Sequence, residues 1–277
     1  MPELPEVETV ARGLQARISG KRLLSLTLNR GDLRKKLPPR LKHKLEGRRV
    51  EAVSRRAKYI LVHFDDGGVL IAHLGMSGRL VFSDRQNPRP HEPHDHVVFD
   101  FEGGVELRLN DARRFGLLDY STQSGLAAHP LFRHLGPEPL GPEFDGALLS
   151  KLLKGKKTPI KAALLDQRVV AGLGNIYVSE ALYGADLSPR RLAGTVTGDR
   201  AGRLAHAIRD VLTRAISAGG SSLRDYVQAS GELGYFQHQW AVYGKEGEPC
   251  PDCDCRTGIK RIVQAGRSTF YCAKRQR

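Results

Sequence analysis

The stretch YILVHFDDGGVLIAHL (residues 59–74) places two mainly apolar runs on either side of an Asp-Asp-Gly-Gly sequence. Short runs rich in Ile, Val and aromatic residues favour strands, and acidic residues followed by glycine favour a tight turn. The stretch therefore predicts a β-hairpin within a β-rich domain.

Similar patterns lie on both sides of this hairpin. Residues 24–28 alternate leucine with Ser and Thr, which predicts a strand with its three leucines on one face. Residues 99–110 repeat the alternation around a Gly-Gly turn, which predicts a second hairpin. Before these strands, apolar residues recur at helical spacing and end near a glycine: Val7, Val10, Ala11, Leu14, Ile18 and Gly20. One helix followed by regular short strands predicts an N-terminal β-sandwich or barrel.

The pattern changes after HPLFRHLGPEPLGPEF (129–144), because prolines and glycines at this density are typical of a linker. Three helices are predicted beyond it: one after Thr158-Pro159, one after Asn175 and a long one over 203–220. The fold class is therefore α+β with two domains. We expect a β domain over 1–130, a linker over 131–150, a helical domain over 151–242 and a cysteine-bearing hairpin over 243–277.

The charge balance indicates a polyanionic partner. The chain has 44 Lys and Arg against 30 Asp and Glu, a formal net charge of +14 and a pI of about 9.9. Nucleic acid is the first candidate for such a partner. No apolar run approaches the roughly 18 residues that a membrane span needs, and the acidic start is unlike a signal peptide. We therefore expect a cytoplasmic protein, associated with the nucleoid when bound to DNA, with no membrane partner.

The stretch KTPIKAALLDQRVVAGLGNIYVSEAL (157–182) predicts two short helices joined by a turn, with Gly172 and Gly174 at the entry to the second helix. Backbone N–H groups at a helix N-terminus bind phosphate, and glycines let a DNA backbone approach. Helix packing or a tight turn is the more usual reason for a lone Gly-x-Gly. Basic neighbours, including Lys161 and Arg168, favour phosphate contacts without sequence choice.

Two further loops carry candidate DNA wedges. LNDARRFG (109–116) places Arg113 and Arg114 beside Phe115, and Met76 lies on a glycine-flanked turn. In an ordinary domain Phe115 would be core and the arginines solvated. In a DNA-binding chain, an aromatic wedge beside guanidinium groups fills the gap that an extruded base leaves in a duplex.

The stretch HEPHDHVVF (91–99) contains three histidines and Asp95, a composition that also occurs in metal sites. We reject a metal site here because the ligands would straddle a proline turn and the start of a strand. Histidine at a strand edge is commonly a hydrogen-bonding residue.

All four cysteines lie in the last 28 residues: Cys250, Cys253, Cys255 and Cys272. In an intracellular chain this clustering indicates a metal site before disulfides, and free thiols are the alternative. Four thiolates would make a closed structural Zn²⁺ site that folds a segment too small to fold alone. A second Cys-x-x-Cys is missing, so the fourth ligand is Cys255, a donor from elsewhere, or absent. Arg267, at the tip of the predicted hairpin, would be presented to a phosphate.

The chain opens MPELPEVETV (1–10). Because Pro2 is small enough for Met1 to be trimmed, it could become an N-terminal secondary amine, a nucleophile with Glu3 and Glu6 beside it. Proline and glutamate near a helix start also suit the geometry and dipole of a helix, so these ten residues alone favour the helix start.

Ordered motifs along the whole chain resemble the bacterial formamidopyrimidine-DNA glycosylase family. They are PELPEVETV, RRAKYI, HLGMSGRL, NDARRFG, VAGLGNIYVSEAL, GGSSLRDYVQASGELGYFQH, VYGKEGEPC and VQAGRSTFYC. The resemblance implies an N-terminal β-sandwich, a helix-two-turn-helix domain and a C-terminal zinc finger. It also implies a monomeric enzyme that removes oxidised purines, such as 8-oxoguanine and formamidopyrimidines, from duplex DNA and then cuts the strand at the abasic site.

The resemblance implies catalytic roles for four residues. Pro2 would attack the sugar C1′ and form an iminium intermediate, Glu3 would transfer protons, and Glu6 would support it. Lys58 would clamp a phosphate close to the nucleophile. A terminal amine has a pKa of about 7.7–8, so a useful fraction is neutral at physiological pH.

The resemblance also implies three sets of DNA contacts. The void-filling residues are Met76, Arg113 and Phe115, with Arg114 beside them. The phosphate-gripping residues are Asn175, Arg267 and His73. The loop that closes over the flipped base contains Ser221, Arg224 and Tyr226.

One departure from the family concerns the zinc site. Arg275 stands where the family usually has the fourth cysteine, so we expect one structural Zn²⁺ with Cys255 as the substitute ligand. Two other functions remain open: an endonuclease VIII-type glycosylase for oxidised pyrimidines, and a non-catalytic protein that binds damaged DNA. The ELPEV motif and the long loop at 217–238 favour the purine enzyme.

Overall fold

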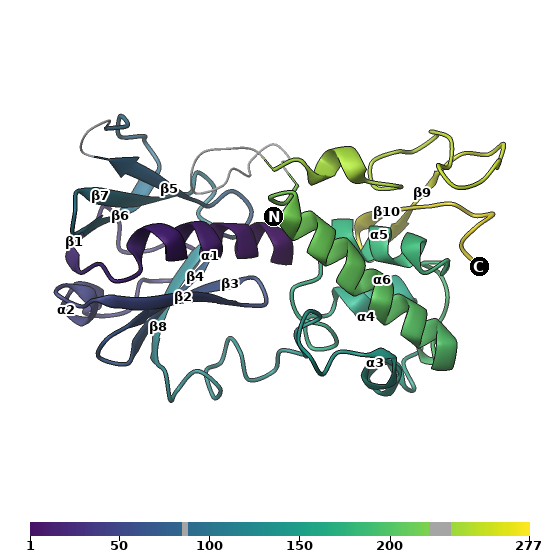
Figure 1. Ribbon diagram of the computed structural model, residues 1–277, viewed down its shortest axis with the longest axis horizontal. Helices are drawn as coiled ribbons and strands as arrows, with labels where there is room; N and C mark the ends of the chain where they lie inside the picture. The colour runs from purple at the N-terminus through teal and green to yellow at the C-terminus, as the bar shows by residue number, and fades with distance from the viewer. Residues whose placement is uncertain (85–87, 222–233) are drawn as a thin grey trace. The chain divides into compact units, whose positions relative to one another are not determined.

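The computed structural model describes residues 1–84, 88–221 and 234–277, and the chain falls into two compact units. The first unit comprises Met1–Arg133 with Ala218–Gln237, and the second comprises His134–Ser217 with His238–Arg277. Figure 1 shows the helices and strands of each unit. Within the described residues, no helix combines the length and the apolar character needed to cross a membrane.

Two four-stranded antiparallel sheets form the first unit, with strand orders β1-β6-β7-β5 and β2-β3-β4-β8. The strands are β1 (Leu23–Leu28), β2 (Val50–Arg56), β3 (Tyr59–Phe64), β4 (Gly68–His73), β5 (Arg79–Asp84), β6 (Asp95–Phe101), β7 (Val105–Asn110) and β8 (Leu117–Thr122). Both hairpins predicted from the sequence are present, as β3 with β4 and β6 with β7. The β-sandwich with an N-terminal helix is therefore confirmed.

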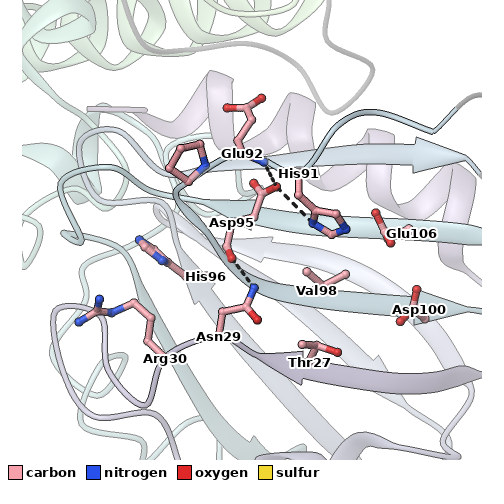
Figure 2. A pocket seen from close by; sticks show the side chains of 11 residues that line it. Thr27, Asn29, Arg30, His91, Glu92, Asp95, His96, Val98, Asp100 and Glu106 are labelled. Atoms are coloured by element: carbon pink, nitrogen blue, oxygen red, sulfur yellow. Dashed lines mark hydrogen bonds and ion pairs between the residues drawn. The ribbon is translucent and has the colours of Figure 1, made fainter.

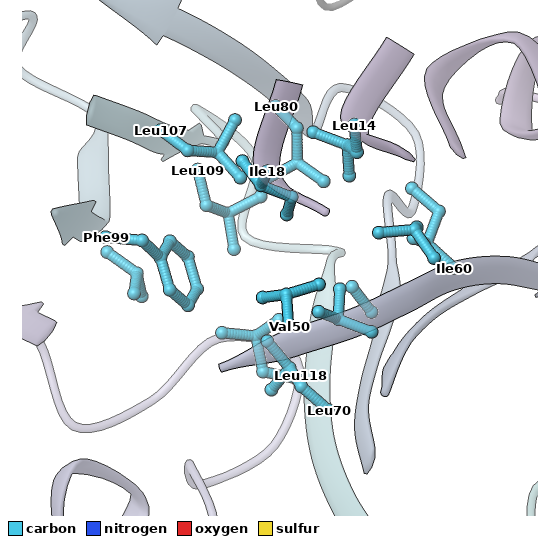
Figure 3. Close-up of a cluster of buried hydrophobic side chains, with 14 of the residues drawn as sticks. Leu14, Ile18, Val50, Ile60, Leu70, Leu80, Phe99, Leu107, Leu109 and Leu118 are labelled. Atoms are coloured by element: carbon cyan, nitrogen blue, oxygen red, sulfur yellow. The ribbon is translucent and has the colours of Figure 1, made fainter. Parts of the chain in front are cut away.

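The core of this unit lies between the two sheets and the helix α1 (Leu4–Ile18), which packs along β2 and β3. Figure 3 shows Leu14 and Ile18 of α1 among side chains from both sheets, such as Val50 and Leu107. A short helix, α2 (Leu41–Leu45), adds two more buried leucines. This packing fixes the first residues of the chain on the sandwich.

Strand β1 departs from the alternation in its sequence. Leu23 and Leu26 are buried, whereas Leu24 is 50% exposed. The pairing with β6 shifts register between Leu23 and Ser25, and such a bulge changes which side chains face the core. The prediction that the leucines at 24, 26 and 28 share one face is therefore wrong.

The second unit is mainly helical. Its elements are α3 (Gly146–Leu153), α4 (Ile160–Leu165), α5 (Asn175–Gly184), η1 (Ala193–Thr195), α6 (Gly198–Ser217), β9 (Lys260–Gln264) and β10 (Arg267–Tyr271). The 3-10 helix η2 (Phe236–Gln239) spans the join between the units. The three predicted helices are present as α4, α5 and α6, and the predicted hairpin as β9 with β10. Helix α3 was not predicted, although Asp145 caps it by accepting a hydrogen bond from Leu148 N at 2.7 Å.

We expect Leu14→Ala to lower the free energy of unfolding by about 2–5 kcal/mol, because it leaves a cavity in a packed core. Leu14 has no exposed surface, whereas Leu24 is half exposed. The matched control Leu24→Ala should change the free energy of unfolding by less than about 0.5 kcal/mol. Urea unfolding followed by circular dichroism measures both, and equal losses would contradict the placement of the two leucines.

Candidate active site

The start of α1 is held by a reciprocal pair of hydrogen bonds. Glu3 is the N-cap residue, and its side chain accepts from the backbone N–H of Glu6. In return, Glu6 Oε2 accepts from Glu3 N at 2.8 Å. Both carboxylates are almost fully buried, at 4% and 2% exposed. Because a buried charge is costly unless it is hydrogen-bonded, these contacts fix the backbone directly after Pro2.

The second oxygen of Glu6 binds a distant part of the same unit. Glu6 Oε1 accepts a hydrogen bond from Ser221 N at 2.8 Å. The neighbouring Gly220 has φ +81°, and a Cβ there would lie 3.1 Å from Glu6 Oε1, so the backbone approaches closely. Ser221 also forms a β-bridge with Tyr235, which joins the two ends of the loop. Of the predicted loop residues, Ser221 is therefore beside Glu6, whereas Arg224 and Tyr226 lie outside the described residues.

The predicted nucleophile is next to this cap. Pro2 is buried, and Met1, which precedes it, is 41% exposed. While Met1 is attached, the Pro2 nitrogen is part of a peptide bond and has no basic lone pair. Removal of Met1 converts the same nitrogen into a secondary amine at the end of the chain.

Lys58 and His73 come together through the register of β3 and β4. Lys58 lies in the turn before β3 and is buried, and the next residue, Tyr59, pairs with His73. His73 Nδ1 accepts a hydrogen bond from Gly75 N at 3.0 Å. The neutral imidazole therefore carries its proton on Nε2.

The electrostatic environment keeps His73 neutral. Burial, helped by the positive charges of Lys58 and Arg34, lowers the pKa of His73 from 6.5 to about 4. Sequence reasoning missed Arg34, whose only signal was the basic stretch RGDLRKKLPPRLKHK (30–44). At neutral pH the site thus offers a cationic lysine and an uncharged N–H donor, which together suit a phosphate.

The two predicted wedge loops are in contact. Phe115 is 46% exposed in the loop after β7, and the Arg113 guanidinium lies 4.7 Å from the centre of its ring. Gly75 has φ +62°, and a Cβ there would lie 2.3 Å from the Phe115 carbonyl carbon. The turn with Met76 and the loop with Phe115 therefore pack backbone to backbone. Since Phe115 projects outward, the interpretation of this ring as core is wrong.

In the second unit, Asn175 and the β9–β10 hairpin meet. Asn175 is the first residue of α5, and its Nδ2 donates to Ser268 O at 3.0 Å, next to the exposed Arg267. Within the described part of the chain, the buried Asn175 Oδ1 has no hydrogen-bond partner. The structure thus places two predicted phosphate-gripping residues side by side.

Lys161 differs from expectation. It was predicted to contact phosphate, but it is fully buried, and its Nζ donates to Ser268 O at 2.9 Å and to Thr269 Oγ1 at 2.6 Å. Lys161 therefore ties the hairpin that carries Arg267 to α4. Its partners lie more than 100 residues away in sequence, so no local pattern could reveal them.

Two further residues that sequence reasoning missed shape this unit. Gln167 Oε1 accepts from Gly172 N at 2.8 Å, and its Nε2 donates to Leu173 O at 2.8 Å, which closes the glycine turn before α5.

Glu180 accepts from three consecutive backbone N–H groups, those of residues 241–243. Burial raises the pKa of Glu180, although the three N–H donors oppose the rise. An acidic residue inside the apolar helix NIYVSEALYG was its only signal.

The four cysteines form one cluster of thiols without a disulfide. Their sulfur atoms all lie within 4.8 Å of one another, with Cys253 and Cys255 at 3.5 and 3.6 Å from Cys272 Sγ. A tetrahedral Zn²⁺ with Zn–S bonds of about 2.3 Å has sulfur atoms about 3.8 Å apart, so the arrangement fits this ion. Cys255 thus belongs to the set with Cys250, as expected.

Arg275 lies beside the thiols and is engaged elsewhere. Its guanidinium forms ion pairs with Asp186 and Asp252 and lies 4.7 Å from the ring centre of Tyr183. The Tyr183 hydroxyl in turn contacts Cys250 Sγ at 3.2 Å. Arg275, Asp252 and Tyr183 therefore form a network of charged and polar contacts next to the cysteine cluster.

A separate hollow of about 580 Å³ lies along β1 and β6 (Figure 2). Asn29 Nδ2 donates to Asp95 O at 2.7 Å, and His91 pairs with the Asp95 carboxylate at 3.9 Å. Asp100 and Glu106 add two more acidic groups to the lining. Because acidic groups repel a polyanion, this hollow does not suit DNA.

Comparison with known proteins places the chain among DNA repair enzymes. Family models described as "Formamidopyrimidine-DNA glycosylase N-terminal domain" and "Formamidopyrimidine-DNA glycosylase H2TH domain" match residues 1–118 and 135–227. The formamidopyrimidine-DNA glycosylase of Rhodospirillum centenum is 58% identical over 291 residues, covering 100% of both chains.

Solved structures are similar to this chain over almost its whole length. MutM (Fpg) from Thermus thermophilus matches with a TM-score of 0.87 at 42% identity, covering 99% of this chain and 98% of that one. Lactococcus lactis Fpg in complex with N7-benzyl-Fapy-dG DNA matches with a TM-score of 0.89 at 36% identity, covering 100% of both chains. The same protein in complex with abasic-site DNA has a TM-score of 0.89 at 37% identity, covering 99% of each chain.

We expect His73 to titrate with a pKa near 4, well below its ordinary value of 6.5. Since the unfolded chain binds this proton from about pH 6.5 downward and the folded chain only near pH 4, stability falls as the pH drops through this window. Nitrogen-detected NMR of the imidazole measures the pKa directly. Lys58→Met should raise it, because a positive neighbour is lost, whereas Lys42→Met in α2 should not. A pKa near 6.5 in the wild type would contradict the buried, neutral ring.

Proposed function

The chain belongs to the formamidopyrimidine-DNA glycosylase family, and we propose that Pro2 is the nucleophile with which it excises damaged bases. It is a DNA glycosylase and abasic-site lyase that acts on oxidised purines in damaged duplex DNA. The Lactococcus lactis complexes hold a formamidopyrimidine nucleotide and an abasic site, which are the substrates of the two successive reactions. These relatives favour the purine enzyme over the oxidised-pyrimidine glycosylase and the non-catalytic binder.

The observation that carries the role of Pro2 is the buried cap directly after it. The nitrogen of Pro2 lies in a ring without a rotatable side-chain bond, so its direction depends on the backbone of the following residues. Glu6 accepts a hydrogen bond from Glu3 N at 2.8 Å, which fixes that backbone, and another from Ser221 N at 2.8 Å, which holds the Glu6 carboxylate in place. Because both Glu6 oxygens are occupied as acceptors, Glu6 is a positioning residue, and Glu3 is the proton-transfer group beside the nucleophile.

The reaction requires several proton transfers near Pro2. The nitrogen lone pair attacks C1′, and the base leaves with the electrons of the C1′–N bond and takes up a proton. Loss of the nitrogen's own proton and opening of the C1′–O4′ bond, with protonation of O4′, give an iminium ion. Removal of a C2′ proton then expels the 3′ phosphate, and a second elimination expels the 5′ phosphate. The carboxyl group of Glu3 donates and accepts these protons.

DNA is held by groups from both units. Lys58 and neutral His73, with Arg34 nearby, bind a phosphate close to the nucleophile. Asn175 and Arg267 grip phosphates from the second unit. Met76, Arg113 and Phe115, flanked by Arg114, fill the space that the everted nucleotide leaves, and the loop with Ser221, Arg224 and Tyr226 covers the base. A monomer carries this complete set.

The four cysteines would hold one structural Zn²⁺. The ion would cross-link the segment that carries Cys250, Cys253 and Cys255 to Cys272 at the end of β10, and so stabilise the hairpin that presents Arg267. Arg275, at the place of the family's fourth cysteine, contributes ion pairs with Asp186 and Asp252 in place of a thiolate.

We expect the purified protein to contain one Zn²⁺ per chain and Cys255→Ser to lose most of it, because a closed site needs four ligands. Arg275→Ala should retain the ion, since its guanidinium is not a ligand. Metal analysis measures the content, and Co²⁺ substitution reports the number of thiolates by its absorption spectrum. Full Zn²⁺ content and a four-thiolate cobalt spectrum in Cys255→Ser would contradict this ligand set.

Borohydride trapping on a duplex with 8-oxoguanine opposite cytosine tests the role of Pro2. We expect a covalent adduct from the wild type and none from Pro2→Leu, because a bulky second residue keeps Met1 in place and leaves no free amine at position 2. Pro2→Ala still permits trimming and should give a weaker adduct through its primary amine. Mass spectrometry of the intact chains checks the trimming, and an adduct of wild-type yield from Pro2→Leu would refute the role of Pro2.

A further inference from the structure

Asp111 is a fully buried carboxylate that the catalytic scheme leaves unused. It follows β7, and its two oxygens accept hydrogen bonds from two different loops. Ser77 Oγ donates to Oδ1 at 2.7 Å, and Gly116 N donates to Oδ2 at 2.7 Å. Hydrogen bonds to a carboxylate are roughly twice as strong as those between neutral groups. The carboxylate is therefore a firm link between the two loops.

Each hydrogen-bond donor adjoins a wedge residue. Ser77 follows Met76, and Gly116 follows Phe115. Ser77 Oγ also accepts a hydrogen bond from Arg113 N at 3.3 Å. One carboxylate and one hydroxyl thus connect the backbone segments that carry all three void-filling side chains.

The sheet holds Asp111 from the other side. Asp111 N donates to His94 O at 3.0 Å, and Asp111 O accepts from His96 Nε2 at 2.9 Å. His96 belongs to β6 and is among the side chains around the hollow in Figure 2. The expectation that a histidine of this stretch is a hydrogen-bonding residue holds for His96. Asp111 is therefore anchored to the sandwich as well as to the loops.

Gly116 lies too close to Asp111 to carry a side chain. A Cβ on Gly116 would lie 2.9 Å from Asp111 Oδ2 and 3.2 Å from His73 O. The backbone can therefore approach the carboxylate only without a side chain. The same close approach links the wedge to the strand that carries His73, so the wedge and the phosphate site share one framework.

We infer that Asp111 is a positioning residue that locks the two wedge loops into one rigid unit, so that Met76, Arg113 and Phe115 enter the duplex together. The inference rests on the void-filling role proposed above for these three side chains. A pre-organised group loses little conformational freedom on binding, so the lock lowers the free-energy cost of filling the gap. The contacts of Asp111 matter only where a base pair has been opened in a duplex. At an abasic site in a single strand there is no gap to fill, so they should have no effect there.

Asp111→Asn tests this inference with little change of shape. Asparagine can still accept a hydrogen bond from Ser77, but it turns an NH₂ donor toward Gly116 N–H. We expect kcat/KM for 8-oxoguanine opposite cytosine to fall about tenfold or more, as for the loss of one hydrogen bond to a charged group. Trapping on a single-stranded abasic oligonucleotide should change by less than about twofold, since it needs no wedge.

Asp100→Asn is the matched control. Asp100 Oδ2 accepts from Ser25 Oγ at 2.7 Å, which is the same kind of serine–aspartate contact on the sheet and outside the wedge loops. This variant should match the wild type in both measurements. Ser77→Ala removes one of the two hydrogen bonds to Asp111 and adds no new donor. It should lower kcat/KM on the duplex by less than Asp111→Asn does, and it should leave trapping on the single strand unchanged. Thermal unfolding of each variant verifies that it is folded.

Two results would overturn the inference. One is wild-type kcat/KM on the duplex in both Asp111→Asn and Ser77→Ala. The other is that Asp111→Asn lowers kcat/KM on the duplex and trapping on the single strand by the same factor, which would indicate a general structural defect. Absence of any adduct from the wild-type protein would overturn the proposed function and this inference with it.

Discussion

The interaction on which the site depends is the buried carboxylate of Glu6 between Glu3 N and Ser221 N. The proposed nucleophile, Pro2, lies at the chain terminus and has no rotatable side-chain bond that could aim it. Its direction follows from the backbone of the next residues, which the hydrogen bond from Glu3 N to Glu6 helps to fix. Glu6 also accepts a hydrogen bond from Ser221 N. The proposed nucleophile and the backbone at Ser221 therefore share one anchor.

The same kind of contact appears at three places in the molecule. Glu6, Asp111 and Glu180 are all buried, and each accepts backbone N–H groups from a segment outside regular strands. Loops have no ladder of hydrogen bonds, so a buried acceptor with two oxygens substitutes for one. The attraction to DNA has a different origin, because it follows from the net charge of +14 of the whole chain.

Local patterns were sufficient to predict the elements that depend on local forces. The two hairpins, α1 and α5 follow from alternation, helical spacing and turn residues, and the thiol cluster follows from cysteine spacing. Phe115 and Asn175 were identifiable as site candidates because wedge and phosphate contacts need these residue types in loops and at helix starts. The family resemblance supplied what patterns could not, above all the proposed role of Pro2.

Features that depend on distant partners were not predictable. The sequence around Lys161 predicts a phosphate contact, whereas in the structure this side chain donates hydrogen bonds to Ser268 and Thr269. The bulge in β1 that exposes Leu24 arises from its pairing with β6, about 75 residues away. Arg34 shifts the pKa of His73 from a part of the chain without a recognisable motif. In each case the decisive contact is tertiary, and sequence spacing carries no trace of it.

The most direct test of the account is to locate the covalent bond to DNA. The borohydride-reduced complex with an 8-oxoguanine duplex can be digested with protease and nuclease and sequenced by tandem mass spectrometry. The account predicts that the deoxyribose remnant lies on the nitrogen of Pro2, in an N-terminal peptide that lacks Met1. A remnant on Lys58 or on any other lysine, with Pro2 unmodified, would contradict it.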